Sequence, residues 1–313
     1  MTSRLPIPAA LALSLLGPAP AAAQGTDGFY VSTSFGLTSA PGADATVFGA
    51  NHPTRCDRLL YASPGDAPTD PECMAPLAST RQGLLAFGRN FGREQALALG
   101  YETGRLRVET EVLLRNQTGE ATLFEVGADR SLIGKDTEWS AISPPNADIY
   151  NFRSLQAFAN AYVGIGSPSS WAPYLGGGAG LAMLDFGFYM AFHRKSLDEG
   201  YLEAFGGSRS DPGAAPEWQR AAAGTLSLMD APVDEVAFAY QLLAGVDRSL
   251  GEKTTLGLKA RWTSIRTVSA PLPWTMVRSH EPVHADGQTP FFWELEFSGL
   301  GYLGVAVEMR RRF

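Results

Sequence analysis

Charged residues are scarce in this chain: Asp, Glu, Lys and Arg make up 18% of its 313 residues, below the roughly 25% of a typical soluble domain. The net charge of −7 leaves no basic excess for a nucleic-acid partner. A hydrophobic share of 45% argues against wholesale disorder. After the N-terminus, no apolar run reaches the about 18 residues of a membrane-spanning helix. A transmembrane β-barrel stays possible, because its polar lumen offsets its apolar exterior.

The N-terminal 23 residues predict a secretory signal peptide. Arg4 precedes an uncharged stretch, 5–23, that ends in Ala21-Ala22-Ala23 before Gln24. A membrane anchor is the alternative, which the small residues at the end of the stretch disfavour. We therefore expect cleavage near Ala23 and Gln24, export, and one mature domain over 24–313.

Cysteine is nearly absent, since the chain has only Cys56 and Cys73. An even cysteine count in an exported protein predicts a disulfide. The two residues are close in sequence, so the bond would be a local staple within one segment.

Alternation with a period of two residues is the dominant pattern. In 105–116, for example, Leu106, Val108 and Val112 alternate with Arg107, Glu109 and Glu111. Side chains of a strand point to opposite faces, so such segments have one apolar and one polar face. Eight strands are predicted: 28–38, 95–102, 105–116, 152–166, 171–186, 235–248, 253–266 and 298–313.

The connections between these strands alternate in length. Four are long (39–94, 117–151, 187–234 and 267–297) and three are short (103–104, 167–170 and 249–252). In an up-and-down meander all the long loops lie at one end. The predicted fold is all-β: an eight-stranded antiparallel up-and-down transmembrane β-barrel with four long extracellular loops. A soluble barrel with its apolar face inward is the alternative, disfavoured by charges that recur on the polar faces.

The polar faces predict a charge network in the lumen. An eight-stranded barrel is just wide enough for side chains to fill it, and isolated buried charges are too costly, so the charges should pair. The inward glycines Gly176, Gly178 and Gly180 would leave room for large lumen side chains. We expect a lumen plugged by salt bridges, with a narrow porin-like ion channel as the alternative. The expected network is Arg107, Glu109, Glu111, Lys259, Arg261, Glu308 and Arg310.

Aromatic residues gather near the ends of the predicted strands that carry the short turns. Such residues are typical of the girdle that membrane barrels place at the lipid–water interface. Ordinary strand aromatics are the alternative. The predicted interfacial aromatics are Tyr30, Tyr101, Trp171, Tyr174 and Phe313.

Several strand motifs occur in a familiar order: GFYVSTSFG from Gly28 to Gly36, GYETGRLRVETE from Gly100 to Glu111, and PYLGGGAG from Pro173 to Gly180. On these motifs the chain resembles the small eight-stranded outer-membrane barrels of the OmpA/OmpX-like and surface-antigen kind. The resemblance implies residence in the bacterial outer membrane. It also implies periplasmic chaperones and insertion by the barrel assembly machinery, with Phe313 as the assembly signal. Arg311 stands where that family usually has a further aromatic residue.

Catalytic chemistry has little support. The segment from His280 to His284 matches the HExxH pattern of zinc proteases, but Pro282 disfavours the helix that this chemistry needs. All four histidines fall in predicted loops, without a nucleophile placed beside them. We expect no enzyme, cofactor or metal site, with a lipid-modifying outer-membrane enzyme as the less favoured alternative.

The long loops carry an acidic excess. We expect a structural or surface-interaction role through loops 39–94, 117–151, 187–234 and 267–297. The expected partners are outer-membrane lipid and a surface ligand, and no nucleic acid.

Overall fold

The computed structural model describes residues 27–40, 42–49, 53–74, 80–87, 89–118, 121–125, 146–165, 171–273, 288 and 292–313. Three predictions lie outside these residues: the signal peptide 1–23, the turn 167–170 and the HExxH-like segment 280–284. Among the described helices, none has the length and apolar character needed to cross a membrane.

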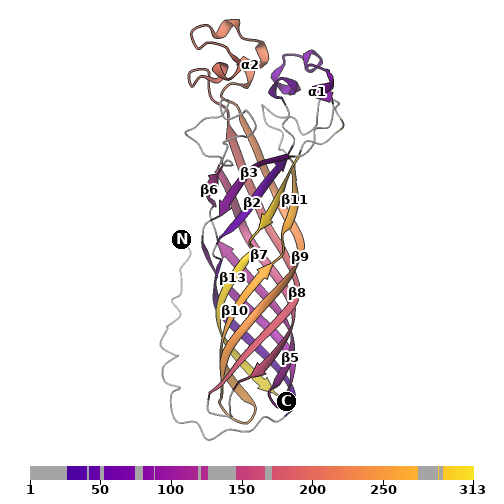
Figure 1. Cartoon of the computed structure of the whole chain (residues 1–313), viewed down its shortest axis with the longest axis vertical. Helices are drawn as coiled ribbons and strands as arrows, with labels where there is room; N and C mark the ends of the chain where they lie inside the picture. Colours follow the sequence, from indigo (N-terminus) through magenta and orange to yellow (C-terminus); the bar gives the residue numbers. More distant parts are fainter. Residues whose placement is uncertain are drawn as a thin grey trace, which may run out of the picture.

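Eight strands close into one antiparallel barrel (Figure 1). Its strand order is β1-β13-β10-β9-β8-β7-β5-β4, so each strand pairs with its neighbours among the barrel strands in sequence and the last closes onto the first. The predicted all-β barrel is confirmed. The strands are β1 (Gly28–Ala40), β4 (Asn90–Thr103), β5 (Leu106–Thr118), β7 (Asn146–Gly164), β8 (Ala172–His193), β9 (Leu226–Ser249), β10 (Thr254–Ile265) and β13 (Gly301–Arg312).

The two ends of the barrel differ, as the alternating connections predict. At one end, here called the turn end, β4 passes into β5 through a tight turn in which Gly104 has a φ of +56°, a conformation that favours glycine. The C-terminus lies at this end (Figure 1). The opposite end, here called the loop end, carries the long connections and the helices.

A second sheet lies at the loop end, in segments that the sequence analysis assigns to loops. It has five antiparallel strands in the order β11-β12-β2-β3-β6 and continues the barrel wall (Figure 1). Its strands are short, which is why they escape a search for membrane-length segments. They are β2 (Ala43–Gly49), β3 (Thr80–Phe87), β6 (Ala121–Glu125), β11 (Val268–Pro273) and β12 (Phe292–Ser298).

The outer face of the barrel is apolar over most of its length. On β13, Leu303, Val305, Val307 and Met309 are each more than half exposed. On β9, outward Asp234 is followed towards the turn end by Val236 and other apolar residues. This band of outward side chains, called the apolar belt, includes Leu97, Leu99, Val108, Val112, Leu175, Leu181, Val236, Leu242, Leu258, Leu303, Val305, Val307 and Met309. Soluble proteins rarely expose so continuous an apolar surface.

The interior is divided along the barrel axis. Towards the turn end the inward side chains are charged or polar, whereas towards the loop end they form an apolar core. In that core the rings of Phe186 and Phe297 lie 5.2 Å apart, edge to face, and Phe152 stacks on Phe186 at 5.5 Å. The core joins the second sheet to the barrel strands and includes Val47, Phe152, Leu184, Phe186, Phe188, Met190, Met229, Val268, Leu295 and Phe297.

Two lobes complete the loop end. The disulfide lobe (53–74) carries three short 3₁₀ helices, Thr54–Cys56, Arg58–Leu60 and Pro64–Asp66, and the helix α1 (Pro71–Met74). The helical lobe (194–225) carries two, Tyr201–Phe205 and Pro212–Ala214, and the helix α2 (Glu217–Ala222). Leu60 of the first lobe packs with Tyr201 and Leu202 of the second in a small shared core.

The inward glycines of β8 leave room for the neighbouring strand β7. A Cβ would collide with the Tyr162 ring at Gly176, with the Asn160 amide at Gly178 and with backbone at Gly180. A Cβ on Gly180 would lie 1.8 Å from the backbone oxygen of Ala157, whereas a Cβ on Gly177 would come no closer than 3.4 Å to a neighbouring atom. We expect Gly180→Ala to cost about 1–3 kcal/mol, because the adjacent strand must move. The matched control Gly177→Ala should change the free energy of unfolding by less than about 1 kcal/mol. Urea unfolding of both variants in lipid vesicles measures this, and equal effects would contradict the packing described.

Candidate functional site

The predicted lumen residues lie together inside the turn-end half of the barrel. Strand β5 supplies Arg107, Glu109 and Glu111, β10 supplies Lys259 and Arg261, and β13 supplies Glu308 and Arg310; all seven side chains are buried. Strand β5 stands opposite β10 in the ring of eight. Contacts between these two strands therefore cross the whole lumen.

Lys259 is surrounded by carboxylates from two other strands. Its Nζ lies 2.5 Å from Glu308 Oε2, and 3.7 Å from both Glu109 Oε1 and Glu111 Oε1. A lone buried ammonium would be costly, and here three acidic neighbours compensate it. The same lysine holds the carboxylates together against their mutual repulsion.

Arg261 makes the best-formed cross-lumen pair. Its Nη2 donates to Glu111 Oε1 at 2.7 Å and its Nη1 to Glu111 Oε2 at 2.8 Å, a bidentate arrangement. The same Nη1 donates to Gln241 Oε1 at 2.6 Å. The fork geometry fixes the distance between opposite walls of the barrel.

Further lumen residues were not predicted. Asp247 on β9 accepts from Arg107 Nη1 at 3.2 Å and from Arg310 Nη2 at 2.6 Å. Nearer the loop end, Arg115 Nη2 lies 3.1 Å from Glu94 Oε2. Asp247, Arg115 and Glu94 all occupy inward-facing positions in the alternation of their strands, so the sequence pattern could have identified them as lumen residues. Glu94 and Arg115 face each other across the β4–β5 hairpin, whereas the partners of Asp247 come from strands distant in sequence, and no sequence pattern gives that register.

The prediction of an aromatic girdle is wrong for two of its five residues. Tyr30 is fully buried and its hydroxyl donates to Glu109 Oε2 at 2.7 Å. Tyr174 is buried as well, edge to face with Tyr162 at 5.6 Å. Both residues have the inward parity of their strands, which decides their direction whatever their height in the barrel. Phe29, next to Tyr30, is the outward aromatic residue, 63% exposed.

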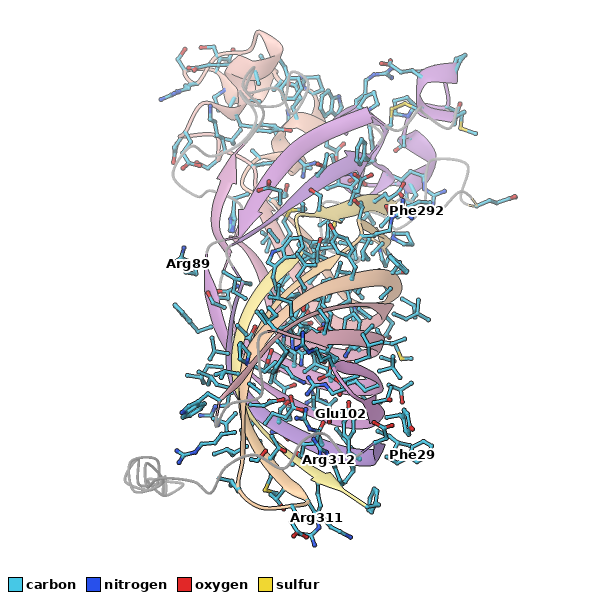
Figure 2. The ribbon with its side chains drawn as sticks, turned by 60° about the horizontal axis from the view of Figure 1, so that its bottom comes forward. Phe29, Arg89, Glu102, Phe292, Arg311 and Arg312 are labelled. Carbon is cyan, nitrogen blue, oxygen red and sulfur yellow. A yellow bond between two sulfur atoms is a disulfide. The ribbon has the colours of Figure 1, made fainter. Side chains whose placement is uncertain are left out.

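The other three predicted aromatics are on the outside. Tyr101, Trp171 and Phe313 are exposed at the turn end. Phe29 stacks edge to face on Tyr101 at 5.1 Å. Figure 2 shows Phe29 and Arg311 pointing away from the barrel at this end, while Glu102 and Arg312 lie close together, with Arg312 Nη2 3.1 Å from Glu102 Oε2.

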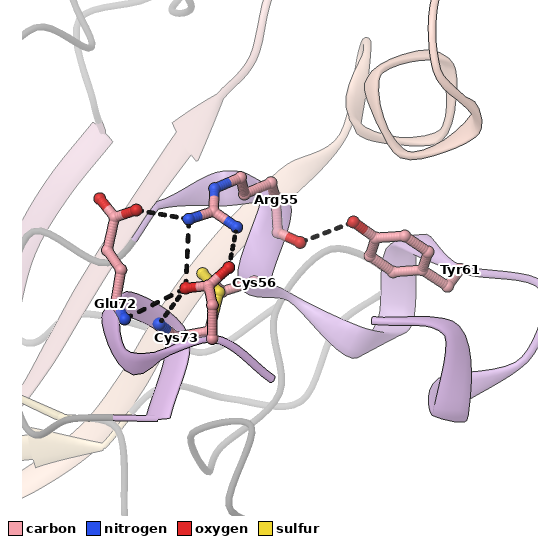
Figure 3. The surroundings of a disulfide bond; sticks show 6 residues. Arg55, Cys56, Tyr61, Glu72 and Cys73 are labelled. Carbon is pink, nitrogen blue, oxygen red and sulfur yellow. Dashed lines mark hydrogen bonds and ion pairs between the residues drawn. A yellow bond between two sulfur atoms is a disulfide. The ribbon is translucent and has the colours of Figure 1, made fainter. Parts of the chain in front are cut away.

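The disulfide lobe contains the predicted bond between Cys56 and Cys73, separated by 17 positions (Figure 3). Beside it, Arg55 Nη1 lies 2.6 Å from Asp70 Oδ2, and Arg55 also pairs with Glu72. The guanidinium of Arg55 holds the pKa of Asp70 below its usual range. The Tyr61 hydroxyl donates to the backbone oxygen of Arg55 at 2.7 Å, which ties the lobe into one unit.

Removing the disulfide tests its contribution to this lobe. We expect the double variant Cys56→Ser/Cys73→Ser to lower the stability of the lobe by about 3 kcal/mol, the value typical of a loop of this length. Trypsin should then cut faster near Arg55 and Arg58, while the folded barrel keeps its gel mobility before boiling. Ser63→Ala, an exposed change in the same lobe, is the control. Two free thiols in the exported wild-type protein would contradict the bond itself.

The charged side chains of the lumen form ion pairs that join opposite walls of the barrel. Within the described ranges, no group of three or more His, Cys, Asp or Glu side chains is arranged to hold a metal ion. The charged groups are neutralised by each other across the barrel, and the apolar core lies beyond them at the loop end. Buried side chains therefore line the described interior at both levels.

Comparison with known proteins gives similar folds and no relatives by sequence. No protein-family model and no curated protein matches the chain. Similar solved structures include Neisserial surface protein A (12% identity, TM-score 0.34, 91% of this chain and 97% of that one). Another is OprG from Pseudomonas aeruginosa, with 12% identity and a TM-score of 0.41 over 93% of this chain and 98% of that one. A third is the outer membrane protease OmpT from Escherichia coli, with 8% identity and a TM-score of 0.34 over 90% of this chain and 97% of that one. The fold assignment rests on the strand order and closure of this chain itself.

Proposed function

We propose that this chain is an integral protein of the bacterial outer membrane whose role is surface interaction through its loop end. The apolar belt supports the membrane location, because a closed barrel leaves no unpaired strand edge in lipid and needs an apolar exterior. Insertion by the barrel assembly machinery belongs to the same proposal. The role is binding and not catalysis.

The observation that carries the surface role is the folded structure beyond the apolar belt. A second sheet, an apolar core and two lobes that pack together rise from the loop end. An anchor alone would not need this structure, whereas a binding surface needs a rigid support. The ion pairs across the lumen support interaction over transport as the role.

Excising the helical lobe tests the surface role. The backbone N–H of Arg194 donates to Thr225 O at 2.9 Å, and that of Gly224 to Lys195 O at 2.8 Å, so the two ends of the lobe are already adjacent. Residues 196–223 can be replaced by Asn-Gly, which forms a two-residue hairpin turn. We expect a barrel that folds and inserts but no longer supports adhesion of cells that display it.

Three results would contradict the proposal. If adhesion survives removal of this lobe and of the disulfide lobe together, the surface role is wrong. If the purified wild-type chain gives stepwise conductance in planar bilayers, the lumen is open. Full extraction of the chain from membranes by carbonate would contradict the membrane location.

A further inference from the structure

A groove is present on the outer wall, at the loop-end edge of the apolar belt. It lies over β1, β4 and β5, has a volume of about 630 Å³, and is lined among others by Leu37, Phe91, Arg93, Gln95, Leu114 and Asn116. Leu37, Phe91 and Leu114 are 70%, 68% and 51% exposed. The chain itself therefore leaves the apolar part of the groove uncovered, and Leu97 and Val112 continue it into the belt.

A row of polar side chains, with an arginine on each side of an asparagine, borders the groove. The strand register places Arg93 opposite Asn116, and Asn116 opposite Arg153, on β4, β5 and β7. All three side chains are exposed on the outer face. Because neighbouring strands lie about 4.8 Å apart, two long guanidinium side chains two strands apart can converge on one anion above the Asn116 amide.

These arginines differ from those in the lumen. Among the described residues, neither Arg93 nor Arg153 forms an ion pair, although Asp185 is the next residue of the row, beside Arg153. Arg89 adds a third exposed cation just before β4 and projects from the wall (Figure 2). The row continues from Arg153 into the exposed carboxylates of Asp185 and Asp234, so its positive charge is confined to β4, β5 and β7, where the groove lies. On this part of the wall the arginines favour an anionic ligand.

We propose that this groove binds a membrane lipid with an anionic phosphate headgroup, which lies between Arg93 and Arg153 while an acyl chain lies along Leu37 and Leu114. The inference rests on the proposed membrane location. Arginine suits it, since the guanidinium pairs with phosphate through two parallel hydrogen bonds and its aliphatic stem can lie along apolar surface. The position of the row at the edge of the belt is the level at which lipid headgroups begin.

Native mass spectrometry of the full chain in a neutral detergent tests the proposal, with equimolar phosphatidylglycerol and phosphatidylcholine of equal chain length as probes. We expect retention of phosphatidylglycerol over phosphatidylcholine by roughly thirtyfold, because each of two basic residues near a lipid surface contributes about 1 kcal/mol. The variant Arg93→Gln/Arg153→Gln should lose this preference. Arg266→Gln is the matched control, because Arg266 is exposed at the same end and follows β10 on the opposite wall.

Further measurements distinguish binding of a lipid from binding of a free anion. Leu114→Thr should weaken lipid retention without changing the preference for the anionic headgroup. If inorganic phosphate displaces phosphatidylglycerol at similar concentrations, the groove recognises phosphate alone and the proposal is wrong. Equal retention of both lipids by the wild type would also overturn it. If the double glutamine variant does not fold, Arg93→Lys/Arg153→Lys replaces it, with a partial loss of preference expected.

The failure of this inference and of the proposed function are distinguishable. A chain that resists carbonate extraction but shows no lipid preference contradicts only the groove. A chain that carbonate extracts completely contradicts the membrane location on which the groove depends.

Discussion

Replacing Arg261 by methionine is expected to lower the free energy of unfolding by about 3–5 kcal/mol, the cost typical of removing one partner of a buried ion pair. Methionine can fill much of the space but leaves the Glu111 carboxylate without its bidentate partner. Glu94 would lose a second cation, since Arg261 Nε lies 3.5 Å from its Oε1. Urea unfolding of the barrel refolded in lipid vesicles, followed by gel mobility without boiling, measures the change.

Two further variants separate the ion pair from the loss of an arginine as such. Arg311 lies on the neighbouring strand β13 with its side chain outward, and Arg311→Met should change stability by less than about 0.5 kcal/mol. The double variant Arg261→Met/Glu111→Leu should cost clearly less than the sum of its single changes, because it removes both charges at once. If the costs are additive, the two side chains do not form the cross-lumen pair described here.

The eight barrel strands could be located because alternation is a local signal. The largest errors were at two of their ends: β8 continues to His193 and β9 begins at Leu226, so both extend into the expected loop 187–234, and His193 lies in a strand. Each membrane-length strand shows its two faces within its own sequence, as β5 does in the switch from Arg107 to Val108. The same rule gives the inward direction of Glu109, Lys259 and Glu308. Alternation along β1 and β8 also directs Tyr30 and Tyr174 into the lumen. Their assignment to the outer girdle was wrong because it relied on their aromatic character and their position near the strand ends, and not on the face to which each side chain points.

The loop end could not be predicted in the same way. Strand β12 alternates Trp293, Leu295 and Phe297 with Phe292, Glu294 and Glu296, but its neighbours β2 and β11 come from different loops. When a sheet is assembled from strands of separate loops, the sequence of any single loop does not show which strands will pair. The lumen ion pairs likewise depend on contacts between distant segments, since Arg261 and Glu111 meet only because eight strands close into a ring.

Replacing Phe297 by alanine is expected to cost about 3–5 kcal/mol, as for other buried phenylalanines, and to act mainly on the loop end. Phe297 is 1% exposed, and its ring contacts those of Phe186 and Phe188, so its loss leaves a cavity between β12 and β8. The cross-lumen pairs lie towards the turn end and keep their partners. Amide hydrogen exchange should therefore speed up in β2 and β12, while β10 and β13 remain protected.

The control for this prediction lies on the same strand. Phe292 is 50% exposed, and Phe292→Ala should change the exchange of β2 and β12 only slightly, because little packing is lost. If Phe297→Ala instead speeds exchange equally in β10 and β13, the two halves unfold as one cooperative unit. The loop end would then be part of the barrel's own stability, and lobe excision would have to be judged first by whether the barrel still folds. Independent exchange would mean that the loop end can change or be removed while the charged lumen keeps the barrel closed.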